Sequence, residues 1–209
     1  MLVFLCLGLF VGLPMSITLH VGEIVFSVLF SLILISGAVG ITGRPVLAVF
    51  VALLTVATLV LRWASVRNPT SLLRVWSQAL SIVLLAVFVA LVLVQVFRDG
   101  PITSYRIQGA IVVYLLIGLT WSAAYELLFH VVPGAFTFAQ AQPVGSGEGG
   151  LTYFSFVTLT TLGYGDITPL HPTARSLVIA EALLGQLYPA ILIARLVSLE
   201  LETRRTVKP

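Results

Sequence analysis

The sequence predicts an all-α membrane protein of about six transmembrane helices, with a short re-entrant helix between the last two. Hydrophobic residues make up 59% of the chain and charged residues only 9%, whereas an average soluble domain carries about 25% charged residues. Most apolar runs approach the about 20 residues that cross a bilayer, where only helices satisfy their own backbone groups. The run Leu151–Thr160 is about half that length, too short to span and typical of a re-entrant segment.

Residues 1–100 are expected to hold four transmembrane helices, whose role the sequence does not indicate. The four apolar runs are Leu2–Leu19, Ile24–Ile41, Val46–Leu61 and Gln78–Phe97. The first run could also be a cleaved signal peptide. A signal peptide normally has a basic residue before its apolar stretch and this run has none, which favours a retained helix.

The segment Arg62–Ser77 differs from its neighbours because it carries three arginines and two tryptophans. Tryptophans are enriched at the level of the lipid headgroups, so we expect an interfacial connector. The sharper alternative is a voltage sensor, which repeats arginines inside a spanning helix. Irregular spacing between the arginines, and the absence of charge in the following run, favour the connector.

Residues 101–209 form the second predicted unit. Its elements are an outer helix at 107–132, a re-entrant helix at 151–160, a glycine motif at 161–166 and an inner helix at 173–199. The motif reads Thr160-Thr161-Leu162-Gly163-Tyr164-Gly165-Asp166. Glycine adopts positive φ cheaply, so glycines at every second position suit a backbone whose successive carbonyls turn toward one axis.

This motif resembles the selectivity filter of potassium channels, usually Thr-Val-Gly-Tyr-Gly-Asp, with Leu162 in place of the usual valine. The resemblance covers about 107–199 and implies the potassium-channel pore domain. It implies that K⁺ binds the carbonyls of Thr161, Leu162, Gly163 and Tyr164, with the Thr161 hydroxyl at the inner end. Gly165 completes the ion-binding motif, and Tyr164 braces it.

One filter per chain implies a homotetramer around one axis. On this resemblance the protein is a potassium-selective channel and not an enzyme. K⁺ is its permeant ion, and no cofactor is expected. Lipid is the other expected partner. Nucleic acid is not expected, because the net charge is only +3 and the basic residues lie at the ends of apolar runs.

Filter support is expected from Tyr153, Phe154 and Asp166. The two aromatic residues stand where the family often has a cuff around the filter, although they could simply pack in a buried helix. We expect the Tyr153 hydroxyl to reach Asp166 behind the filter. Asp166 would also raise the local cation concentration, or be a solvated turn residue. Val157 replaces a glutamate that pairs with this aspartate in some family members, so inactivation behaviour does not carry over.

Two carboxylates and two helix-weakening residues complete the candidates. Glu126 and Glu181 lie in predicted spanning helices, where an ionisable residue is a functional hypothesis, with a structural hydrogen bond as the alternative. Arg175 is a possible partner for either. Gly185 lies near the position of the family's gating hinge, but a small residue also allows close helix packing. Pro189, one turn later, would weaken the helix further.

The resemblance also implies orientation in the cell membrane. The filter of such channels enters from outside, so both termini are expected in the cytoplasm. Arg62, Arg67 and Arg74 then fall outside, so the positive-inside rule is only weakly obeyed.

Two alternatives remain. A nonselective channel or an auxiliary subunit has the same fold, but the intact Gly-Tyr-Gly disfavours it. An intramembrane aspartyl protease also uses Gly-x-Gly-Asp, with a second carboxylate sharing a proton. The other aspartate, Asp99, is expected at the opposite face.

Overall fold

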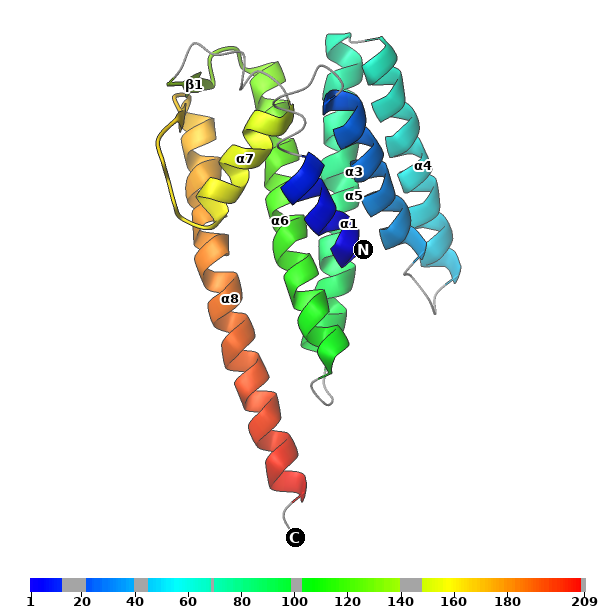
Figure 1. The fold of residues 1–209 in the computed structure, drawn as a ribbon, viewed down its shortest axis with the longest axis vertical. Helices are drawn as coiled ribbons and strands as arrows, with labels where there is room; N and C mark the ends of the chain where they lie inside the picture. The colour runs from blue at the N-terminus through cyan, green and yellow to red at the C-terminus, as the bar shows by residue number, and fades with distance from the viewer. Residues whose placement is uncertain (13–21, 40–44, 69, 99–102, 140–147, 208–209) are drawn as a thin grey trace.

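The computed structural model describes residues 1–12, 22–39, 45–68, 70–98, 103–139 and 148–207, which form helices and one small sheet (Figure 1). Asp99 lies outside these described residues. The elements in chain order are α1 (Leu2–Leu7), the π-helical η1 (Gly8–Gly12), α3 (Gly22–Val39), α4 (Pro45–Arg67), α5 (Ser71–Phe97), α6 (Ser104–Val131), β1 (Phe136–Phe138), α7 (Glu148–Leu159), β2 (Ile167–Pro169) and α8 (Pro172–Val207).

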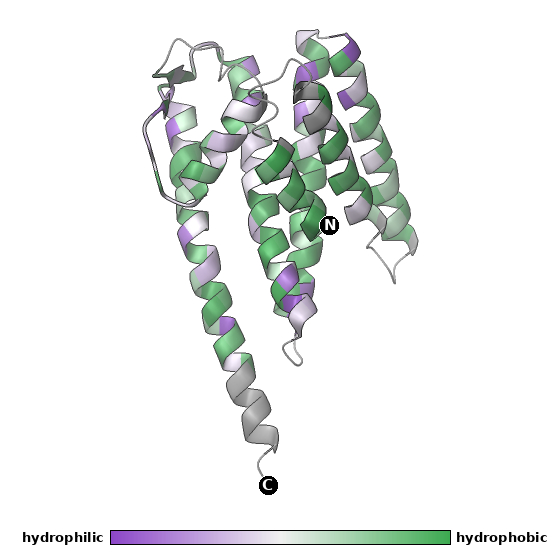
Figure 2. Cartoon of the chain, viewed as in Figure 1, coloured by the Kyte–Doolittle hydropathy of each residue, from purple (hydrophilic) through white to green (hydrophobic). Residues whose placement is uncertain are grey.

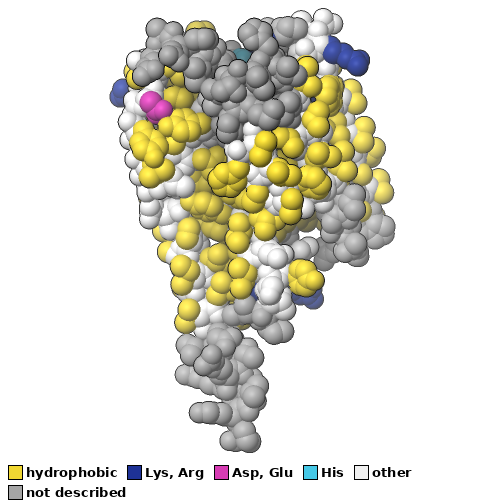
Figure 3. All heavy atoms as spheres, in the orientation of Figure 1, with side chains coloured by type: hydrophobic (Ala, Val, Ile, Leu, Met, Phe, Trp, Pro, Cys, Tyr) yellow, Lys and Arg dark blue, Asp and Glu magenta, His cyan; other side chains and the backbone are white. Residues whose placement is uncertain are grey.

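Four described helices are long and apolar enough to cross a membrane: Val46–Arg67, Ser71–Phe97, Ser104–Val131 and Pro172–Leu199. Apolar residues fill their middles, as Figure 2 shows. On the face seen in Figure 3, hydrophobic side chains cover most of the described surface, with Lys and Arg toward its ends. The first predicted run, Leu2–Leu19, is described only to Gly12. The total of about six spans therefore stays a prediction.

The prediction of one interfacial connector at Arg62–Ser77 is wrong. Helix α4 continues through Arg62 to Arg67, and α5 already begins at Ser71. Thr70 caps α5, its side-chain oxygen accepting from the Leu73 amide at 3.4 Å. Arg62 stays inside α4 because it is sheltered: the residue is 3% exposed, and its guanidinium lies 4.6 Å from the centre of the Phe30 ring.

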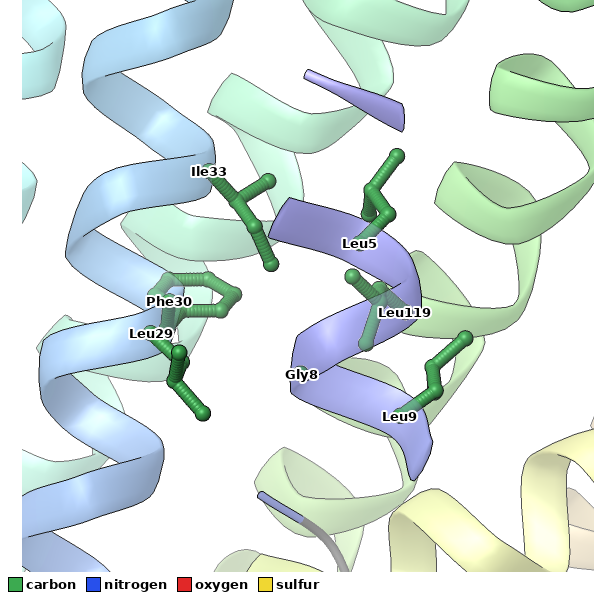
Figure 4. Close-up of a pocket in the computed structure, with 7 residues that line it drawn as sticks. All are labelled: Leu5, Gly8, Leu9, Leu29, Phe30, Ile33 and Leu119. Atoms are coloured by element: carbon green, nitrogen blue, oxygen red, sulfur yellow. The ribbon is translucent and has the colours of Figure 1, made fainter. Parts of the chain in front are cut away.

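The leading helices, those before residue 100, pack against α6. Helix α5 lies along α6, and buried leucines and Phe88 fill the space between them and α3. At the other side, α1 and η1 lie across α3 and α6 around a small apolar cavity (Figure 4). Its lining residues are Leu5, Gly8, Leu9, Leu29, Phe30, Ile33 and Leu119. Apolar burial thus holds the N-terminal helices to α6.

Helix α7 lies obliquely between α6 and α8, and the chain returns from its end to the sheet (Figure 1). Strands β1 and β2 pair antiparallel, with Phe136 opposite Pro169 and Phe138 opposite Ile167. The sheet lies at the same end of the molecule as the turn between α4 and α5, and the C-terminus lies at the opposite end.

Candidate ion-conducting site

The glycine motif follows α7 as an extended return segment with a regular backbone alternation. Positive φ occurs at every second residue: 58° at Thr161, 57° at Gly163 and 80° at Gly165. Thr161 is the only non-glycine residue with positive φ in the part of the chain that is described. A β-branched residue is strained there, so the surrounding contacts must hold it in place.

The amides of this segment turn back toward α7. The Leu162 and Gly163 amides both donate to the Val157 carbonyl, at 2.9 and 3.4 Å, and the Thr161 amide donates to the Thr158 carbonyl at 2.9 Å. Among the described residues, no hydrogen bond reaches the carbonyls of 161–165. The motif therefore presents a row of uncommitted carbonyl oxygens in the single chain. The Val157 side chain is buried and apolar, so it offers Asp166 no partner.

The outer end of the motif is fixed by Asp166 and the sheet. The Tyr153 hydroxyl hydrogen bonds to the Asp166 carboxylate. One carboxylate oxygen of Asp166 also accepts from the Ile167 amide at 3.1 Å, and its backbone carbonyl accepts from Ala139 at 2.8 Å. Asp166 thus joins α7, the glycine motif and the segment after β1.

Phe154 points to the other side of α7. Its ring packs against Tyr125 at 5.2 Å and Phe136 at 5.6 Å between ring centres. The three rings join α7 to α6 and β1 in a buried cluster. Phe154 therefore contacts α6 and the sheet, while Tyr153 contacts Asp166 at the end of the glycine motif.

Glu181 is fully buried where α6, α7 and α8 meet. Its carboxylate accepts hydrogen bonds from Tyr125 of α6 and Ser155 of α7, both at 2.5 Å. The Ser155 hydroxyl also lies 2.7 Å from the Gly118 carbonyl. Arg175 donates instead to the Pro169 carbonyl at 3.2 Å, so it is not the partner of Glu181.

Glu126 is buried on the opposite face of α6, toward the leading helices. The Gln78 side-chain amide of α5 donates a hydrogen bond to its carboxylate. A small cavity beside them is lined by Phe30, Arg62, Gln78, Leu119, Ser122, Ala123 and Glu126. The two carboxylates therefore occupy different places: Glu181 lies between α6, α7 and α8, and Glu126 faces α5 and the cavity beside it.

Gly185 lies in tight contact with the end of α7. A Cβ atom at this position would lie 1.9 Å from the Leu159 carbonyl oxygen. One turn on, α8 continues through Pro189 to Val207. Beside the proline, Tyr188 donates to the Ala110 carbonyl at 2.9 Å, and its ring stacks on Tyr114 at 6.1 Å. The geometry of Gly185 gives direct support to the packing role.

Gln186 is a site residue that the sequence motifs did not single out. Its side-chain amide donates to the Thr161 hydroxyl oxygen at 2.9 Å. Gln78, Tyr125 and Ser155 were also missed. All four are uncharged polar residues inside apolar helices, and that pattern was the available signal. Among the residues searched, no group of three or more His, Cys, Asp or Glu could hold a metal ion.

Comparison with known proteins supports the resemblance inferred from the motif. Residues 127–201 match the ion channel family. The chain is 40% identical over 89 residues to two pore potassium channel c of Oryza sativa subsp. japonica, and 33% identical over 92 residues to the inward rectifier potassium channel Kirbac3.1 of Paramagnetospirillum magnetotacticum. It is also 49% identical over 45 residues to protein LctB of Geobacillus stearothermophilus.

These matches cover a part of each protein. They include 43%, 44% and 22% of this chain, and 18%, 27% and 33% of the respective relatives. The chain therefore spans a third or less of the length of these relatives. No solved structure matches it significantly.

Proposed function

We propose, from the match of residues 127–201 to the ion channel family, that the chain forms a potassium-selective channel. K⁺ would cross the cell membrane passively, down its electrochemical gradient. The Thr161, Leu162, Gly163 and Tyr164 carbonyls would bind it. Two relatives are named potassium channels, which supports the choice of ion.

The backbone of 161–165 carries this proposal. A cation sheds its water only where oxygen atoms replace the hydration shell. Positive φ at alternate residues directs the amides toward α7 and leaves the carbonyls uncommitted. Buried carbonyls without partners are costly, so a segment of this kind must face water, an ion or another chain.

We further propose a homotetramer with the filter on its axis. The side chains of Leu162 and Tyr164 are 58% and 66% exposed in the single chain. In the most apolar stretch of Pro172–Leu199, only 11% of the residues are buried in the single chain. Large apolar side chains of a filter and an inner helix would be covered by neighbouring chains, and four chains would surround one ion with carbonyls.

The proposed orientation places the sheet and Asp166 outside and the C-terminus in the cytoplasm. Asp166 is exposed and would attract cations to the outer mouth. With an even number of spans the N-terminus would also be cytoplasmic.

Ion flux through reconstituted protein tests the proposal. Liposomes carrying the purified chain would be measured under opposed K⁺ and Na⁺ gradients, with Gly165→Asp beside wild type. Gly134→Asp is the matched control, because Gly134 also has positive φ, 76°, and no atom lies within 4 Å of the place that a Cβ would take. We expect wild type and the control to pass K⁺ over Na⁺, and Gly165→Asp to lose that preference.

The alternatives give other results. Equal passage of K⁺ and Na⁺ would indicate a nonselective pore, and no flux at any voltage would indicate an auxiliary subunit. A protease would lose activity in Asp99→Asn, whereas a channel would still conduct.

A further inference from the structure

Helix α8 carries one unusual polar side chain on its filter side. Between Glu181 and Arg195 the only other polar side chain is that of Tyr188, and its hydroxyl is bonded to the Ala110 carbonyl. Gln186 is exposed in the single chain, and its amide nitrogen lies 2.9 Å from the Thr161 hydroxyl oxygen. A carboxamide in an apolar spanning helix is costly unless water or a hydrogen bond satisfies it.

Gln186 therefore faces the inner end of the filter. Thr161 is the first positive-φ residue of the motif and stands nearest to the end of α7. In the proposed channel this is where the filter opens into the water-filled cavity. The role of Gln186 thus rests on that proposed function.

We infer that Gln186 is a positioning residue for the innermost ion site. A hydroxyl oxygen has two lone pairs. The Gln186 N–H occupies one of them and leaves the other for an ion. The same bond fixes the side chain of Thr161, whose backbone is held at a strained φ of 58°. Four Gln186 amides would then ring the cavity below the filter.

This role is separate from ion selection by the carbonyls above. Among the described residues, the side chain of Gln186 has its hydrogen bond with Thr161 and none with the residues 162–165. Loss of the amide should weaken binding at the inner end and leave the preference for K⁺ over Na⁺ intact. A residue that merely held the filter together would affect both.

Ba²⁺ is a suitable probe because it combines nearly the radius of K⁺ with twice the charge. We would measure Ba²⁺ binding to the purified wild-type assembly by calorimetry in K⁺-free buffer. Block by Ba²⁺ added to the inner side would be recorded in planar bilayers. The variant is Gln186→Met, which keeps the length and removes the amide. The matched control is Gln95→Met, at an exposed amide of α5.

We expect Gln186→Met to weaken Ba²⁺ binding roughly threefold to tenfold, as the loss of one hydrogen bond would. The K⁺ to Na⁺ flux ratio and the control should match wild type. If Gln186→Met does not assemble, Gln186→Asn takes its place. Asparagine keeps a polar side chain but is too short to reach Thr161, so we expect the same threefold to tenfold loss of Ba²⁺ binding.

Unchanged Ba²⁺ affinity in both variants of Gln186 would overturn the inference, as would loss of K⁺ preference together with affinity. Failure of the proposed function looks different, because wild type itself would then neither conduct K⁺ selectively nor bind Ba²⁺.

Discussion

At the scale of single residues, the replacement of Gly185 by alanine distinguishes a packing role from a hinge role. The two roles predict stability changes of opposite sign. A Cβ atom here would lie 1.9 Å from the Leu159 carbonyl oxygen, which belongs to backbone that cannot turn aside. We expect Gly185→Ala to lower the free energy of unfolding by about 1–3 kcal/mol, as overpacking does. Thermal or denaturant unfolding of the purified protein in detergent would measure it.

Gly109→Ala is the control for this prediction. A Cβ atom at Gly109 would lie 3.1 Å from a methyl group of Val96, and that side chain can shift. If Gly185 were only a hinge, alanine would stiffen α8 and raise its stability by up to about 1 kcal/mol. A stabilised Gly185→Ala protein would therefore contradict the packing role.

Glu181 gathers two buried hydroxyl donors, so its removal should be costly. Glu181→Ala leaves Tyr125 and Ser155 without their acceptor and opens a cavity between three helices. We expect a loss of about 2–5 kcal/mol in the same unfolding measurement. Glu181→Gln keeps the shape and one acceptor oxygen, and should lose less. Equal losses in the two variants would show that the retained acceptor oxygen and the filled space contribute little.

Tyr153 is expected to keep the outer end of the filter in place. Tyr153→Phe removes the hydrogen bond to Asp166 and keeps the ring. A hydrogen bond contributes about 0.5–1.5 kcal/mol net, so in the proposed channel the ratio of intact to collapsed filter should fall by about threefold to tenfold. Recordings of K⁺ current at low external K⁺ would show faster decay. Tyr105→Phe, at a residue 84% exposed, should decay as wild type does.

At the scale of elements, α4 and α5 show where sequence reasoning reached its limit. Three arginines and two tryptophans suggested that helices end before Arg62. The charge of Arg62 does not end α4, because Phe30 of another helix covers it and polar residues line the cavity beside it. The burial of Arg62 depends on α3, α5 and α6 packing together. The sequence of α4 alone therefore does not predict it.

The contact between α5 and α6 yields a prediction at this scale. Gln78 is 5% exposed and donates to the buried Glu126 carboxylate, joining the leading helices to the pore. Gln78→Leu should lower the free energy of unfolding by about 1–3 kcal/mol, because the buried side chain of Glu126 loses a hydrogen-bond donor. Gln95→Leu on the same helix is exposed and should change it by less than about 0.5 kcal/mol. Equal effects would mean that Gln78 does not join the two parts.

At the scale of the whole molecule, the assembly should depend on the ion. Four chains of 22.5 kDa would give a particle of about 90 kDa besides detergent, measurable by native mass spectrometry. Since a ligand of the folded state stabilises it, K⁺ should raise the temperature at which this particle dissociates, relative to Na⁺. Gly165→Asp should remove the difference. A monomer that is indifferent to K⁺ would contradict both the filter and the assembly.

The sequence predicted the helices of residues 101–209 better than the side-chain contacts between them. Glycine spacing and run lengths indicated a short helix, a return segment and a long helix, because these depend on local backbone preference and on bilayer thickness. It did not predict that Tyr125 and Ser155 both donate hydrogen bonds to Glu181, or that Gln186 donates one to Thr161. Those pairs lie far apart in the chain and meet only after packing.

The small sheet has a mechanical consequence. Strand β1 follows α6 and β2 precedes α8, so the sheet joins the C-terminal end of α6 to the N-terminal end of α8, while the longer route between them runs through α7 and the glycine motif. Two routes that connect the same helices carry a load in parallel. Bilayer tension that draws α6 and α8 apart would load both routes. In the proposed channel, the pairing of β1 with β2 would take part of this load off the segment 161–165.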